Sequence, residues 1–103
     1  MKRTYLAGAM TGHPELNFPL FHAEAARLRA LGYTIVNPAE INPDPAMEWA
    51  DALAADFQHL EHCDSIALLP GWELSRGANR EYGYALGRGF AIVMAADLVE
   101  SRP

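Results

Sequence analysis

The sequence is poor in cysteine and in basic residues, and it lacks a long hydrophobic run. Its single cysteine, Cys63, cannot form an internal disulfide or a cysteine-built metal site, which suits a reducing compartment. Eight Lys and Arg residues stand against 13 Asp and Glu, and the net charge of -5 leaves no basic face for a nucleic-acid polymer. No apolar run approaches the roughly 20 residues that cross a bilayer, and no signal-peptide core follows Met1. We therefore expect a cytoplasmic protein without membrane or nucleic-acid partners.

The apolar residues gather in short runs that indicate buried strands. Half of the 103 residues are apolar and a fifth are charged, which predicts one compact domain over residues 1–103. Four runs have the near-continuous hydrophobicity of strands in a parallel sheet: Thr4 to Ala9, Tyr33 to Asn37, Ser65 to Pro70 and Phe90 to Ala95. Helical patterns separate them, from Pro19 to Gly32, from Ala46 to His62, and from Ser75 or Arg76 to Gly87.

This alternation predicts an α/β fold made of right-handed strand-helix-strand units. We expect a Rossmann-like or flavodoxin-like three-layer sandwich of four or five parallel strands, in the order 2-1-3-4, with helices on both faces. Ligands of such sheets bind beyond the carboxyl ends of the strands where the order reverses, here between the first and third strands. The loops from Gly8 to Phe18 and from Gly71 to Gly77 should line that site. The Pro-rich stretch from Asn37 to Pro45 should form no regular element and lie near the same edge.

Two acidic residues fall on or beside the apolar stripes of predicted helices. Glu81 and Asp56 each follow one apolar residue by three positions and precede another by four. A carboxylate in such a place is usually paired or set at a cleft, because burying an unpaired charge is unfavourable. Paired carboxylates are what glycosidic-bond cleavage needs, one at the anomeric carbon and one at the leaving group. The alternative is structural, with Glu81 paired to Arg80 or Arg88 and Asp56 bonded to a neighbouring loop.

Two loops have features that favour a ligand. The first, Gly8-Ala-Met-Thr-Gly12, is rich in small residues directly after a strand, although it has no dinucleotide or P-loop spacing. In the second, Ser75 predicts a helix N-cap, and the amides around Gly77 would favour an anion. An ordinary N-cap is the alternative. Asp64, just before the third predicted strand, is interpreted as a turn or strand-entry residue.

Aromatic side chains near the same edge could stack on a flat base. Among Tyr5, Phe18, Trp49 and Trp72, we expect Phe18 and Trp72 to contact a ligand because they stand in loops. The predicted substrate-binding residues are Gly8, Met10, Thr11, Phe18, Trp72, Ser75 and Gly77. No metal site is expected, because His62 and Cys63 are adjacent and would diverge at the end of a helix.

Motifs along nearly the whole chain resemble those of one known family. They are Tyr5-Leu-Ala-Gly-Ala-Met-Thr-Gly12, Asn17-Phe-Pro19, Asn37-Pro38, Ala55-Asp-Phe-Gln-His-Leu60 and the stretch from Pro70 to Leu86 with its Glu-x-Gly-x-Ala helix. Together they resemble the nucleoside 2-deoxyribosyltransferase superfamily, and especially its short bacterial and phage members. The resemblance implies that Glu81 is the nucleophile that attacks C1′ of the sugar. It further implies that Asp56 orients or protonates the departing base, with Tyr5 and Gly8 near the sugar.

One position departs from the transferases. Six residues before the nucleophile they carry an Asp that binds the sugar 5′-hydroxyl, whereas this chain has Ser75. Here the chain is similar to the deoxynucleoside 5′-monophosphate N-glycosidases, in which a Ser and nearby amides hold the 5′-phosphate. A hydroxyl in place of a carboxylate removes repulsion toward a phosphate, so the physical argument agrees with the resemblance.

Residues and resemblance together predict cleavage or transfer of the N-glycosidic bond of a nucleoside or deoxynucleoside, carried as its 5′-monophosphate. Tyr5, Asp56 and Glu81 are the expected catalytic residues, and the chemistry requires no metal or organic cofactor. A homodimer or larger homo-oligomer is expected, since a small domain covers its own helices poorly. Two alternatives stay open because fold is a poor guide to function: a nucleotide sensor without catalysis, and an interaction protein that uses the scaffold alone.

Overall fold

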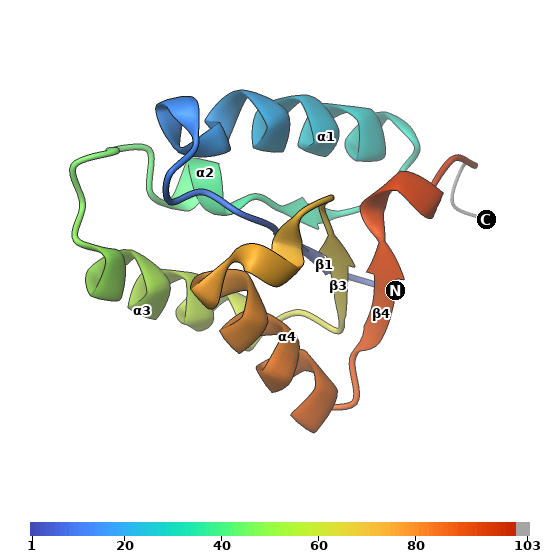
Figure 1. The fold of residues 1–103 in the computed structure, drawn as a ribbon. Helices are drawn as coiled ribbons and strands as arrows, with labels where there is room; N and C mark the ends of the chain where they lie inside the picture. The colour runs from blue at the N-terminus through green and yellow to red at the C-terminus, as the bar shows by residue number, and fades with distance from the viewer. Residues whose placement is uncertain (101–103) are drawn as a thin grey trace.

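The computed structural model describes residues 1–100 and contains one parallel sheet with helices on both faces (Figure 1). The strands are β1 Thr4–Ala7, β2 Ile35–Val36, β3 Ser65–Leu68 and β4 Ala91–Met94. They lie in the order β2-β1-β3-β4, and every neighbouring pair is parallel. The predicted Rossmann-like α/β class and the predicted strand order are confirmed, and residues 1–100 contain no fifth strand.

The helices cover the sheet in two layers (Figure 1). The α-helices are α1 Phe18–Ala30, α2 Pro38–Ile41, α3 Trp49–Leu60 and α4 Arg76–Gly87. Short 3₁₀ turns lie at η1 Pro14–Asn17, η2 Trp72–Leu74 and η3 Ala95–Asp97. Helices α1 and α2 lie over one face of the sheet, and α3 and α4 lie over the other. Because the chain after α1 turns back at Gly32, that residue adopts a positive φ of 98°.

The core consists of one apolar cluster on each face of the sheet. Side chains alternate along a strand, so Leu6 of β1 packs with Phe21 and Leu28 of α1, whereas Tyr5 packs with Leu60 of α3 on the opposite face. All residues of β1 and β3 are buried, which explains their continuous hydrophobicity. Strand β4 is partly exposed because it forms an edge of the sheet.

The structure corrects two of the predicted elements. The Pro-rich stretch contains the helical turn α2, because the side chain of Asn37 accepts a hydrogen bond of 3.0 Å from the amide of Ala39 and Pro38 occupies the first helical position. The expectation of no regular element was wrong for these residues. Helix α3 begins at Trp49 rather than Ala46 and ends at Leu60. None of the helices in the described part of the chain has the length and hydropathy needed to cross a membrane.

Asp64 anchors the first strand at the amino end of the sheet. Its carboxylate accepts hydrogen bonds from the amide of Lys2 at 2.8 and 2.9 Å and from the amide of Arg3 at 3.0 Å. These backbone hydrogen bonds, that of Arg3 first, lower the pKa of Asp64 to about 2. The interpretation of Asp64 as a strand-entry residue is confirmed.

Candidate active site

A cavity of about 70 Å³ lies beyond the carboxyl ends of β1 and β3. Its wall comes from the loop after β1 and from α1, α2, α3 and α4. The predicted residues among its lining are Gly8, Met10, Thr11, Asp56, Ser75, Gly77 and Glu81. The topology thus brings residues from the two predicted loops and from two helices to one place, at the point where the strand order reverses.

A second cavity of about 240 Å³ adjoins the first. The two share Thr11, Trp49, Ser75 and Gly77, so they form one elongated hollow along the start of α4. The second cavity is also lined by His13 and Arg76, whereas the first contains the two acidic residues. The hollow therefore has an acidic end and an end that carries a cation.

The two carboxylates converge on the first cavity from different helices. Glu81 on α4 is 5% exposed and accepts a hydrogen bond of 2.6 Å at Oε2 from the hydroxyl of Tyr5, which is fully buried on β1. Asp56 on α3 is 8% exposed and accepts a hydrogen bond of 2.8 Å at Oδ1 from the side-chain amide of Asn42. Glu81 is therefore bonded to Tyr5, and the alternative pairing with Arg80 or Arg88 does not occur among the described residues.

Burial dominates the electrostatics of this pair. It raises the pKa of Glu81 to about 8; the hydrogen bond from Tyr5 opposes the rise, and the nearby charge of Asp56 adds to it. Burial likewise raises the pKa of Asp56 to about 7, against the nearby Tyr5 hydroxyl and the hydrogen bond from Asn42, which lower it. The pKa of Tyr5 is raised by its burial and by both carboxylates. Two interacting groups titrate as a pair, so near neutral pH the site can present one carboxylate together with one carboxylic acid.

The N-terminus of α4 borders both cavities. Ser75 is its N-cap, and the hydroxyl accepts a hydrogen bond of 3.1 Å from the amide of Ala78. The first amides of a helix, here those of Arg76 and Gly77, have no carbonyl partner within it. A Cβ added at Gly77 would come no closer than 3.7 Å to any neighbour, so packing does not require glycine there.

Gly8 lines the first cavity and is also required for packing. A Cβ added to it would lie 2.8 Å from the Cβ of Leu69, a distance that real Cβ atoms do not show. Leu69 is fully buried immediately after β3. The loop after β1 can therefore cross the end of β3 only because residue 8 lacks a side chain.

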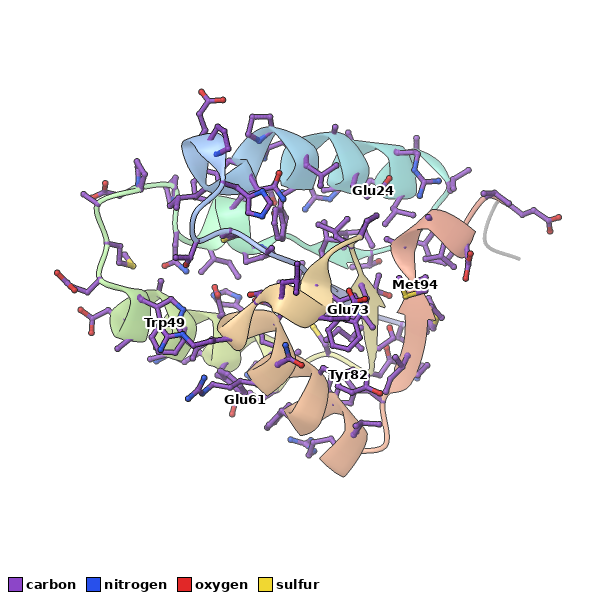
Figure 2. All side chains as sticks on the ribbon, viewed as in Figure 1. Glu24, Trp49, Glu61, Glu73, Tyr82 and Met94 are labelled. Carbon is purple, nitrogen blue, oxygen red and sulfur yellow. The ribbon has the colours of Figure 1, made fainter. Side chains whose placement is uncertain are left out.

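Trp49, at the start of α3, lines both cavities (Figure 2), and Phe21 of α1 also lines the first. The guanidinium groups of Arg76 and Arg80 lie 4.3 and 5.2 Å from the centroid of the Trp49 ring. Neither Phe18 nor Trp72, the aromatics expected to contact a ligand, lines these cavities.

Both of those aromatics are occupied elsewhere. Trp72 packs on Tyr82, with ring centroids 4.7 Å apart. Phe18 packs against the apolar core cluster on the face of the sheet that α1 covers. It also borders a separate hollow beside Pro43 and Pro45. Each aromatic begins a helical element, α1 or η2, rather than standing in a loop as expected, and tertiary packing turns both of them away from the site.

Sequence reasoning placed Trp49 near the site edge without choosing it as a ligand contact, and it did not single out Asn42, which bonds Asp56. The spacing of Trp49, Leu53 and Asp56 places them on one face of α3, a signal that could have identified the tryptophan. Asn42 stands between Ile41 and Pro43 without any periodic pattern, so no comparable signal marks it. Within residues 1–100, no group of three or more His, Cys, Asp and Glu side chains is arranged to hold a metal ion.

Comparison with known proteins gives a family without an assigned activity. Residues 2–94 match the model of a family described as a domain of unknown function, DUF4406. The match extends from the start of β1 through the end of β4. No curated protein matches the chain.

Proposed function

The chain belongs to the DUF4406 family, and on that premise we propose that it cleaves or transfers the N-glycosidic bond of a nucleoside or deoxynucleoside 5′-monophosphate. The observation that carries this proposal is the convergence of Asp56 and Glu81, both buried, on one cavity. The resemblance to the nucleoside 2-deoxyribosyltransferase superfamily and to the monophosphate N-glycosidases supports it. Water as the acceptor gives a hydrolase, and a second base gives a transferase.

Glu81 is the nucleophile in this proposal. Its carboxylate attacks C1′, the bond between C1′ and the base nitrogen breaks, and the electron pair leaves with the base. The resulting glycosyl ester is released when water, or the nitrogen of a second base, attacks C1′. The Tyr5 hydroxyl holds the Glu81 carboxylate by its 2.6 Å hydrogen bond. This bond lowers the pKa of Glu81, whereas burial raises it.

Asp56 is the acid that assists the leaving base. Burial raises the pKa of both acids, to about 7 for Asp56 and about 8 for Glu81, so the pair keeps a proton near neutral pH. The reactive form is the one in which that proton lies on Asp56 while Glu81, held by Tyr5, is ionised. That proton passes to the departing base, and the resulting carboxylate accepts a proton from the attacking water in the second half of the reaction. Each acid has its own hydrogen-bond donor: Tyr5 donates to Glu81, and Asn42 donates to Asp56.

The second cavity suits the phosphate of the substrate. It combines the N-terminus of α4, the hydroxyl of Ser75 and the cationic side chain of Arg76. Helix N-termini and guanidinium groups both attract phosphate oxygens. The summed volume of the two cavities reaches the lower end of the range of small-molecule sites, roughly 300 Å³. The resemblance further implies a homodimer or larger assembly, which light scattering measures directly.

Release of free base from a panel of nucleosides and their monophosphates tests the proposal. Chromatography should detect base and sugar phosphate with the unaltered chain and not with Glu81→Gln or Asp56→Asn. Exposed acids on neighbouring elements supply matched controls: Glu73→Gln and Asp51→Asn should keep full turnover. Binding of a monophosphate without any base release would favour the nucleotide sensor, and no binding at all would favour an interaction protein.

A further inference from the structure

Asn42 connects the Pro-rich segment to the acidic pair. It follows α2 directly and is 8% exposed. Its side-chain amide donates one hydrogen bond of 2.8 Å to Oδ1 of Asp56 and another of 3.2 Å to the carbonyl oxygen of Ala52. Both N–H groups of the amide are thus used on α3.

The orientation of this amide is fixed by its two partners. The carbonyl of Ala52 can only accept a hydrogen bond, so it requires the nitrogen of Asn42 on that side. A rotated amide would place the oxygen of Asn42 against the carbonyl of Ala52 and the carboxyl of Asp56. Asn42 is therefore a donor to Asp56 whatever the protonation state of the acid.

The backbone around Asn42 restrains the side chain. Its amide N–H donates to the carbonyl of Pro38 at 3.0 Å, and Pro43 follows it. Pro43 disfavours the helical conformation for the residue before it, and Asn42 leaves the helix with φ of -124° and ψ of 75°. The restrained backbone keeps the amide directed at α3.

We propose that Asn42 is a positioning residue that determines which oxygen of Asp56 carries the catalytic proton. Oδ1 accepts the N–H of Asn42, and the carbonyl oxygen of a carboxylic acid is the better acceptor, so this bond favours the hydrogen of a protonated Asp56 on Oδ2. In the proposed reaction, on which this role rests, the Oδ2–H bond breaks as an N–H bond forms on the departing base. The negative charge left on Asp56 is then stabilised by the amide of Asn42.

The titratable groups near Asp56 are Tyr5 on β1 and Glu81 on α4, and the charge of Asp56 raises the pKa of each. The guanidinium groups of Arg76 and Arg80 on α4 are held over the ring of Trp49. Asn42, which donates the hydrogen bond to Asp56, does not titrate. Removing it should therefore change the proton affinity of Asp56 without adding or removing a charge.

The test is a carboxyl carbon NMR titration of Asp56 in the full chain, which needs no substrate. Asn42→Ala removes the donor, and Asn42→Leu removes it while keeping most of the volume. Each should raise the pKa of Asp56 by roughly one pH unit, because a hydrogen bond to the ionised form is lost. Asn37→Ala is the matched control: it removes a buried amide at the other end of α2 that bonds Ala39 and contacts neither acid.

The outcomes separate the positioning role from the reaction. A rise in both Asn42 variants and none in Asn37→Ala supports the role. An unchanged pKa of Asp56 in the Asn42 variants overturns it. An equal rise of this pKa in Asn37→Ala also overturns it, because loosening of the segment around α2 would then be the cause. A chain that shows the rise and releases no base contradicts the proposed function but keeps the hydrogen-bond assignment. Where base is released, the limb of the pH-rate profile that belongs to Asp56 should move by the same amount.

Discussion

The hydroxyl of Tyr5 donates a 2.6 Å hydrogen bond to Oε2 of Glu81 although 76 positions separate the two residues. The first strand and the last helix of the domain thus meet through one buried polar contact. Because the hydroxyl has a single proton, its donation to Glu81 favours the ionised form of that carboxyl over the protonated one.

Replacing this hydroxyl should weaken catalysis more than folding. In Tyr5→Phe the ring still fills its place in the core, but the carboxyl of Glu81 loses the donor that lowers its pKa. We expect base release to fall roughly ten- to hundredfold and the pKa assigned to Glu81 to rise further. Steady-state rates across pH measure both effects. Tyr84→Phe removes a phenol hydroxyl on α4 that bonds Arg88, and it should leave the rate unchanged.

The buried acids should make the chain less stable as pH rises. Folding raises the pKa of Asp56 to about 7 and that of Glu81 to about 8, from ordinary values near 4. Between these limits the folded chain holds more protons than the unfolded one, so the free energy of unfolding decreases with rising pH. Thermal unfolding from about pH 5 to about pH 9 should show Tm falling, and Glu81→Gln should flatten the fall.

Asp64 should have the opposite effect and make the chain less stable as pH falls in the acid range. Its pKa is lowered to about 2 by the amides of Arg3 and Lys2, so its contribution is present above the ordinary value near 4 and is lost as pH falls toward 2. Asp64→Asn should lower Tm at neutral pH by a few degrees and reduce the loss of stability in acid. Melting curves at about pH 7 and about pH 3 compare the two conditions; an unchanged acid limb would contradict the role of the anchor.

A carboxylate at residue 75 should alter substrate choice. Asp is as good an N-cap as Ser, so Ser75→Asp keeps α4 intact while placing a negative charge where the phosphate is proposed to bind. We expect kcat/KM for monophosphates to fall at least roughly tenfold relative to the unphosphorylated nucleosides. Ser75→Ala removes the hydroxyl without adding a charge, so it should lower that ratio less than Ser75→Asp does. An equal loss for both substrate types would contradict a phosphate subsite beside Ser75.

Replacing glycine by alanine should lower the stability of the fold at Gly8 and raise it at Gly83. Gly8→Ala forces a Cβ against buried Leu69 and should destabilise the chain by about 1–3 kcal/mol. Gly83 lies within α4 with nothing within 4 Å of an added Cβ, so Gly83→Ala should stabilise it by about 0.5–1 kcal/mol. Denaturant unfolding of both variants decides the matter.

The parts of the fold that could be predicted are those with a repeating pattern. Strands β1 and β3 are buried on both faces, and this leaves a continuous apolar run in the sequence. Glu81 interrupts a stripe of regular spacing, so its place on the buried face of α4 could be inferred. The alternation of strands and helices, with right-handed connections, predicted a parallel sheet with helices on both faces.

The parts that could not be predicted depend on contacts between segments. Helix α2 forms because Asn37 caps it, and a proline-rich composition conceals that signal. Phe18 and Trp72 were expected in loops but begin α1 and η2, and they pack against His22 and Tyr82. Asn42 reaches Asp56 through a turn whose geometry no local pattern encodes.

The two indoles of the chain have different surroundings, and this gives the molecule a built-in optical signal. The ring of Trp49 forms part of both cavities, whereas Trp72 is stacked on Tyr82 away from them. A molecule that enters the hollow changes the environment of one fluorophore and leaves the other as a constant background. Titrations of intrinsic emission, with the Trp72-only variant Trp49→Phe as the blank, can therefore follow occupancy without a labelled ligand.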